Sequence, residues 1–128
     1  MALIIDLKPQ ERIIIGNALI TNDASRARLH IEGQAPILRE KDIMREEEAN
    51  SPCKRIYLTI QLMYLAHDAK SLHEIYFQQV RDVQSAAPST TPMFLKINEY
   101  ILDGHYYKAL KEARSLIEYE GKLLANVG

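Results

Sequence analysis

The chain has 128 residues, of which 47% are hydrophobic and 26% charged, a balance typical of an ordinary globular domain rather than of a disordered tail. This length is about the size of one domain, so we expect the chain to fold alone or as a small homo-oligomer. The formal net charge of −1 excludes a protein that coats polyanions over its whole surface, because such binding scales with the number of phosphates neutralised.

The first third of the chain has the pattern of β-structure. Three short β-branched apolar runs lie before residue 21, and apolar and polar residues then alternate over 26–32. The runs predict strands, and the alternation predicts one apolar and one polar face. Gly16-Asn17 lies between two runs and predicts a two-residue hairpin loop, since glycine readily adopts the positive φ that such loops need. We therefore expect a small antiparallel sheet with one face in water.

Near Asn50 the pattern changes to a helical period. Asn50 and Ser51 offer capping side chains and Pro52 suits a first turn, so a helix should begin there. Over residues 53–66 apolar side chains point nearly all round the helix axis after the first turn. This arrangement predicts a central helix that is buried on several sides.

Three further helices are predicted after the central one. Ser71 is the expected cap of the first, whose apolar residues keep three- and four-residue spacing as far as Ala87. The next carries apolar residues from Phe94 onward and ends at Gly104, a residue suited to a left-handed C-terminal cap. The last runs from about residue 105 to residue 125, and these two helices form a helical hairpin.

Strands followed by helices define an α+β fold, with a small N-terminal antiparallel β-sheet and a four-helix C-terminal half. We place the β-rich region at residues 1–45 and the helical region at residues 46–128. The two regions are expected to form one integrated domain.

The sequence lacks the residue patterns of catalysis and of metal or cofactor binding. Its four histidines are scattered, it has no cysteine pair or HExxH motif, and no glycine-rich loop leads into a helix. No serine stands in a GxSxG motif, and Cys53 lacks the flanking signature of a nucleophile. We therefore expect no enzymatic activity, no metal and no cofactor. The acidic run Glu46–Glu48 is interpreted as a favourable partner of the next helix's N-terminal dipole rather than as a cation site.

The cellular setting is predicted from cysteine usage and from the N-terminal residues. With Cys53 as the one cysteine, no intramolecular disulfide can form, which favours a reducing, cytoplasmic setting. The apolar run near the N-terminus is far too short for a signal core or for a membrane span of about 20 residues. We therefore expect neither secretion by that route nor a membrane partner.

Basic residues and tyrosines are the candidates for binding. Five basic side chains in or beside the predicted strands either bind RNA phosphates and base edges or only keep the sheet soluble. They are Arg12, Arg26, Arg28, Arg39 and Lys41. The seven tyrosines could stack on bases, but at helical spacing most should lie in the core or face a protein partner. Those selected as partner contacts are Tyr64, Tyr106 and Tyr107.

Four sequence blocks in order resemble the FlbT family of flagellin-expression regulators. They are LKPQERIIIG near the N-terminus, APILREKDI, RIYLTIQLMYL and GHYYKALKEARSLIEYE, and the likeness runs from about Leu3 to Leu124. Membership implies binding to the 5′ untranslated region of flagellin mRNA, with mRNA decay promoted in some members and flagellin expression activated in others. It also implies action alongside the protein FlaF, and hence a protein-binding surface.

Within the strand region, residues 10–16 and 35–43 also resemble the RNA-binding carbon-storage regulator CsrA. An arginine in the second block contacts RNA in that family, and Arg39 occupies the matching position. Leucine stands where CsrA has histidine, and Asp6 and Lys8 stand in the stretch where it has paired arginines. The resemblance selects Arg39 as the first candidate RNA contact.

Two functions are therefore open. The first is a post-transcriptional regulator that binds the flagellin mRNA leader through Arg39 and Arg28, with the helices as a scaffold. The second is a protein-interaction adaptor or chaperone-like module that acts with FlaF or flagellin and does not bind RNA itself. Salt dependence separates the two, because RNA association driven by counterion release weakens steeply with ionic strength.

Overall fold

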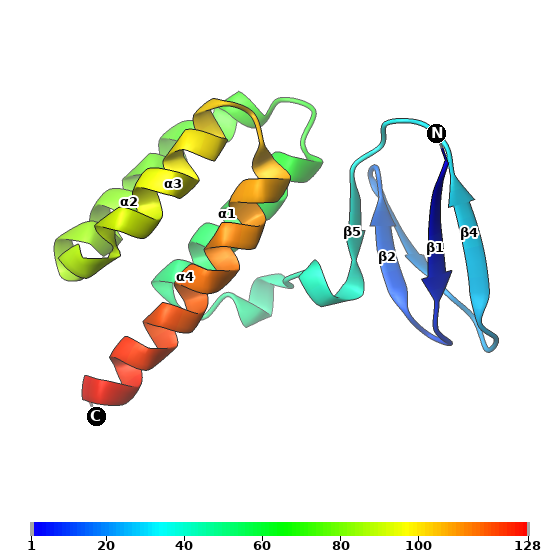
Figure 1. The fold of residues 1–128 in the computed structure, drawn as a ribbon, viewed down its shortest axis with the longest axis horizontal. Coiled ribbons are helices and arrows are strands. Elements are labelled where there is room, and N and C mark those ends of the chain that lie inside the picture. Colours follow the sequence, from blue (N-terminus) through cyan, green and yellow to red (C-terminus); the bar gives the residue numbers. More distant parts are fainter. Residues whose placement is uncertain (1, 128) are drawn as a thin grey trace. The chain divides into compact units, whose positions relative to one another are not determined.

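The computed structural model describes residues 2–127, and the chain divides into two compact units, Met1–Ile43 and Met44–Gly128. Figure 1 shows that the first unit is built from strands and the second from helices. Within the described residues, five strands precede four α-helices. The α+β fold class expected from the sequence is confirmed.

The strands of the first unit are divided over two small antiparallel sheets. One sheet pairs β1 with β4, and the other has the order β3-β2-β5. The strands are β1 (Leu3–Leu7), β2 (Arg12–Ile15), β3 (Ala18–Thr21), β4 (Ala27–Ile31) and β5 (Ile37–Arg39). Strand β5 was not predicted as a separate strand, because its three residues are too few to show an alternating pattern.

The predicted hairpin between β2 and β3 is confirmed. Ile15 pairs with Ala18 in the antiparallel register, so Gly16 and Asn17 form a two-residue loop. Gly16 has a φ of +64°, the left-handed conformation in which a Cβ is unfavourable. Its backbone N–H donates to the carbonyl of Pro36 at 2.8 Å, which connects the hairpin to the segment leading into β5.

Apolar side chains of both sheets form the core of the strand unit. Ile5, Leu7 and Ile13 are buried, and partly buried side chains pack against them. Along β4 the residues alternate between half-buried and exposed, so that Arg28 and His30 lie on the exposed face. The predicted polar face of this strand is therefore confirmed.

The second unit contains four helices, and α1 packs against both α2 and α4 while α3 packs against α4 (Figure 1). The helices are α1 (Pro52–Leu65), α2 (His73–Ala86), α3 (Thr91–Leu102) and α4 (Tyr106–Val127). Helix α1 buries seven of its fourteen residues, including Ile56, Ile60 and Met63. The prediction of a central helix buried on several sides is confirmed, although Leu62 remains half exposed.

Side chains satisfy the polar groups that α1 buries. Ser51 is the predicted N-cap and accepts a hydrogen bond from the Lys54 N–H at 3.2 Å. The Glu120 carboxylate, from α4, accepts from the Cys53 N–H at 2.9 Å and from the Ser51 hydroxyl. Gln61 is 5% exposed and bonds both the N–H and the carbonyl of Met44, at 2.7 and 3.0 Å.

Two local predictions about caps were wrong. The carboxylate at the N-terminus of α1 is that of Glu120, whereas Glu46–Glu48 form a separate 3₁₀ turn in which Arg45 lies 2.9 Å from Glu48. Ser71 does not cap α2, because its hydroxyl donates to the carbonyl of Asp68 within a 3₁₀ turn that precedes the helix. Local sequence patterns cannot reveal an acidic partner that comes from 67 residues away in the chain.

Helix α3 ends as predicted at Gly104, which lies in the turn that leads into α4. This glycine has a φ of +79°. The N–H of His105 bonds the carbonyl of Tyr100 at 2.8 Å, and the N–H of Gly104 bonds that of Ile101 at 3.1 Å. These are the two hydrogen bonds of a Schellman motif, in which glycine relieves the strain of the left-handed residue.

Two residues of α3 give a matched test of the helical core. Ile97 is fully buried, whereas Leu95 is 65% exposed. We predict that Ile97→Ala lowers the free energy of unfolding by about 2 to 5 kcal/mol, because it leaves a cavity in a packed core. Leu95→Ala should change it by no more than about 0.5 kcal/mol. Urea unfolding followed by circular dichroism measures both, and equal losses would contradict this packing.

Candidate functional site

A hollow of about 740 Å³ in the strand unit is bordered by basic side chains. Arg26, Arg28 and Arg39, three of the residues expected to bind RNA, all line it. Lys8 and Asp6 line it as well. Arg26 immediately precedes β4, Arg28 lies within β4 and Arg39 ends β5, so the tertiary structure brings together residues that lie apart in the sequence.

Arg28 is held by a cross-strand ion pair. The antiparallel register of β1 and β4 places Asp6 opposite Arg28. The Arg28 Nε donates to the Asp6 Oδ1 at 3.0 Å, and both side chains are about two thirds exposed, at 66% and 69%. An ion pair this exposed contributes little to stability because water and salt screen it. It orients the guanidinium without blocking access to it.

Arg39 is held more firmly. Its Nη2 donates to the backbone carbonyl of Asp6 at 2.8 Å and lies 3.5 Å from the Glu11 Oε2. Glu11 also accepts from the backbone N–H of Lys8 at 2.8 Å, which fixes the carboxylate beside the arginine. The Arg39 side chain is 41% exposed. Part of its guanidinium is therefore positioned by the protein while part faces solvent.

The hollow has an excess of positive charge that acts on its carboxylates. The hydrogen bond and charge of Arg28, with the charges of Arg26 and Arg39, hold the pKa of Asp6 below its usual value. The hydrogen bond from the Lys8 backbone, followed by the charge of Arg39, lowers the pKa of Glu11. The lining has four cationic side chains and one carboxylate, and Glu11 lies beside Arg39, so the net charge of this group is about +2 at neutral pH.

This arrangement suits the binding of an anion. A guanidinium presents N–H donors in a planar fork, which matches the oxygens of a phosphate or the O6 and N7 of guanine. The lining also includes Ile4, which is 55% exposed, and Ala27, against which a base or sugar could pack. The hollow therefore combines cationic groups that can position a phosphate with apolar side chains that can contact a base.

The remaining basic candidates do not line the hollow. Arg12 begins β2, where it is paired in register with Thr21. Lys41 lies in the 3₁₀ turn Glu40–Asp42 that follows β5. Lys8 also lines the hollow but was not predicted as a site residue. Its place beside the arginines follows from the pairing of β1 with β4, which a single sequence does not reveal.

The three candidate tyrosines lie in two different places in the helical unit. The Tyr64 and Tyr107 rings lie 5.5 Å apart between centroids, and the Lys111 Nζ lies 5.1 Å from the centre of the Tyr107 ring. Tyr106 points elsewhere, with its hydroxyl 2.9 Å from the His73 Nε2, and partial burial with the charge of Asp68 raises the pKa of Tyr106. The structure therefore brings together two of the three.

Three features of the described residues bear on catalysis and membrane insertion: grouped metal ligands, the Cys53 thiol and the length of the apolar helices. No group of three or more His, Cys, Asp or Glu side chains among residues 2–127 is arranged to hold a metal ion. Burial, aided by the charge of Glu120, raises the pKa of the Cys53 thiol to about 12, so the reactive thiolate is scarce at neutral pH. Within the part of the chain that the structure describes, no helix is long and apolar enough to cross a membrane.

The fold and the hollow define a small α+β protein with a basic hollow in its strand unit, followed by a bundle of helices. Residues 3–124 match the family described as Flagellar protein FlbT, and the chain belongs to this family.

Curated relatives have the same family name. The chain is 54% identical over 124 residues to the probable flagellum biosynthesis repressor protein FlbT 1 of Bradyrhizobium diazoefficiens, covering 96% of this chain and 85% of that protein. It is 46% identical to the probable repressor FlbT of Rhodopseudomonas palustris, covering 98% of this chain and 99% of that one. It is 32% identical to the flagellum biosynthesis repressor protein FlbT of Caulobacter vibrioides, covering 99% and 92%. No solved structure matches the chain.

The electrostatics of the hollow can be tested by titration. We predict that Arg28→Gln raises the pKa of the Asp6 carboxyl toward its usual value of 3.8, because the largest cause of the lowered pKa is the Arg28 hydrogen bond. Since the folded-state pKa of Asp6 is depressed, the stability it contributes is present at neutral pH and is lost as the pH falls through the folded-state value. Carboxyl ¹³C NMR measures the shift. Arg12→Gln is the control, and an equal effect of both variants would contradict the assignment.

Proposed function

We propose that this chain is a cytoplasmic, non-enzymatic regulator of flagellum biogenesis that binds the 5′ untranslated region of flagellin mRNA. The observation that carries the proposal is the convergence of Arg26, Arg28 and Arg39 on one hollow of the strand unit. The names of the relatives, which describe flagellum biosynthesis repressors, support the regulatory role.

The hollow suits single-stranded RNA in a local rather than an extended mode. Arg28 and Arg26 are exposed and can reach successive phosphates, whereas Arg39 is held at Asp6 and Glu11 and is the better placed for a base edge. Three or four phosphate contacts to a single strand predict a slope of log K against log salt of about −2 to −3. So small a number of phosphate contacts agrees with a chain whose formal net charge is −1.

Bound at the leader, the protein would control the stability or translation of the message, and repression by mRNA decay is one such outcome. The resemblance to FlbT proteins adds a FlaF-like protein or flagellin as a partner. The partly exposed ring of Tyr107, which lies tilted against the ring of Tyr64, is the candidate contact for such a protein.

The proposal is tested by binding of a flagellin 5′ leader and a scrambled RNA at several salt concentrations. Arg28→Gln should weaken binding of both RNAs and flatten the salt slope by about one unit, as loss of a phosphate contact does. Arg39→Lys keeps the charge but removes the planar fork, and it should cost about 1 to 3 kcal/mol on the leader and reduce the preference over the scrambled RNA.

Arg81→Gln is the matched control, because Arg81 is an exposed arginine on α2 in the helical unit. It should leave the affinity for the leader unchanged. Absence of leader binding by the wild-type protein, or equal loss in Arg81→Gln and Arg28→Gln, would refute binding through the hollow. A partner protein bound in a Tyr107-dependent manner by a chain that does not bind RNA would favour the adaptor role.

A further inference from the structure

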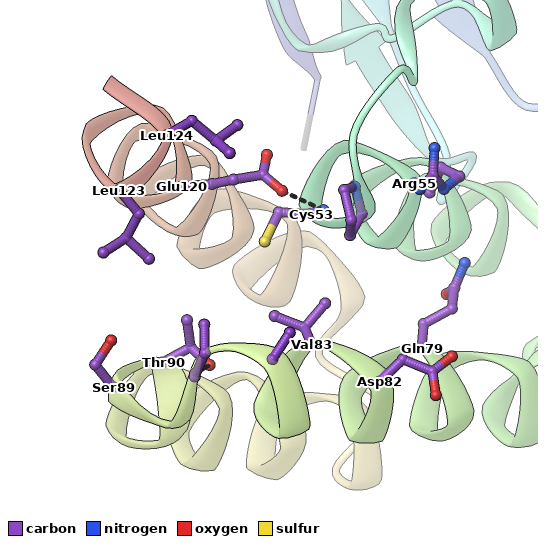
Figure 2. Close-up of a pocket in the computed structure, with 13 residues that line it drawn as sticks. Cys53, Arg55, Gln79, Asp82, Val83, Ser89, Thr90, Glu120, Leu123 and Leu124 are labelled. Atoms are coloured by element: carbon purple, nitrogen blue, oxygen red, sulfur yellow. Dashed lines mark hydrogen bonds between the residues drawn. The ribbon is translucent and has the colours of Figure 1, made fainter. Parts of the chain in front are cut away.

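A groove of about 630 Å³ in the helical unit lies between α2 and α4, and residues of the first turn of α1 also line it. Figure 2 shows Leu123 and Leu124 of α4 on one side and Val83 of α2 across the gap. Cys53 lies beside Glu120, on the side of the gap opposite α2. Most of the surface is apolar, and the small side chains of Ala86 and Ala87 leave room for close approach.

The groove exists because α4 is much longer than its neighbours. It has 22 residues, against 14 in α1 and α2 and 12 in α3. At 1.5 Å per residue, α4 is about 33 Å long and extends roughly 12 Å beyond the length of α1. Leu124 in this last part is 62% exposed. An apolar helix end of this kind lacks the neighbour that would normally cover it.

Two tethers hold the walls of the groove in place. The Glu120 carboxylate bonds the Cys53 N–H at 2.9 Å, drawn as a dashed line in Figure 2, and so fixes α4 to the start of α1. The Tyr119 hydroxyl donates to the Ser89 Oγ at 2.7 Å, which fixes α4 to the 3₁₀ turn Pro88–Thr90 after α2. The groove is therefore preformed, which lowers the entropy lost on binding.

A polar atom in the groove indicates the chemistry of its occupant. Gln79 lines the groove, and its Oε1 is buried without a hydrogen-bond partner among residues 2–127. A buried acceptor left unpaired costs about 1 to 3 kcal/mol, so a rotation of the Gln79 amide that brings its oxygen to a donor in the groove is favoured. The charged lining residues are Asp82 and Glu120 against Arg55, an acidic excess that favours a cationic donor.

We propose that this groove binds an amphipathic helix of a protein partner, one that presents apolar side chains to α2 and α4 and a lysine or arginine to Gln79 and Asp82. A helix fits because the lining positions on α2 recur at helical spacing, at residues 79, 82, 83 and 86, and those on α4 do so at residues 120, 123 and 124. Ridges of a partner helix pack into grooves of this kind between neighbouring helices. The inference is independent of RNA binding by the strand unit.

The test is a selection from a displayed library of helical peptides of about 18 residues on the full-length protein, followed by fluorescence anisotropy with the selected peptides. The proposal expects enriched peptides with apolar residues at i, i+3, i+4 and i+7 and a basic residue on the same face. Ala86→Phe, which fills the groove, and Leu124→Glu should each weaken binding by about tenfold or more.

Leu95→Glu is the matched control, because Leu95 is 65% exposed on α3 and does not line the groove, whereas Leu124 is 62% exposed and does. It should leave the affinity unchanged, and thermal unfolding verifies that all variants fold. Gln79→Leu should abolish the preference for a peptide with lysine over the same peptide with norleucine at that position.

Three results would overturn the proposal. They are no enrichment over the Ala86→Phe protein, binding that Leu95→Glu weakens as much as Leu124→Glu, and enriched peptides without a basic residue. A fourth result would assign the groove to a small apolar ligand instead. In that case no peptide is enriched, the wild-type protein binds the fluorescent dye 1-anilinonaphthalene-8-sulfonate, and Ala86→Phe abolishes the dye fluorescence.

Discussion

Burial of the N-terminal half of α1 is the constraint on which the helical unit depends. The first N–H groups of a helix have no partners within it, and at α1 they lie beside a buried residue, Cys53. Ser51 supplies one acceptor locally, and Glu120 supplies another from the far end of the chain. Because a buried donor without an acceptor is costly, this requirement fixes where α4 crosses α1.

The position of α4 then has two consequences. Its first half packs with α3 and α1 and completes the core around Leu110 and Leu116. Its second half extends past the shorter helices, so that Leu124 remains exposed beside α2. The contact that satisfies the backbone of α1 is thus also the one that forms a wall of the groove. The satisfied backbone of α1 and the shape of the groove therefore depend on the same side chain, Glu120.

In the strand unit, the basic hollow depends on strand register. Asp6 and Arg28 face each other only because β1 pairs with β4 rather than with its neighbour in the chain, β2. A shift of one residue would turn Arg28 to the opposite face and expose Leu29 in its place. The apolar alternation of β4 resists such a shift, because Leu29 and Ile31 pack against the core. The hydrophobic pattern therefore also positions the charges.

The sequence by itself determined the order of strands and helices, the hairpin at Gly16, the Ser51 cap and the turn at Gly104, because each depends on a few adjacent residues with strong backbone preferences. It also indicated Arg39 through a resemblance. Only the tertiary structure decided that Arg26, Arg28 and Arg39 share one hollow, that Tyr64 meets Tyr107 but not Tyr106, and that Glu120 serves α1. These depend on strand pairing and on helix packing between residues far apart in the chain, for which a single sequence carries no local signal.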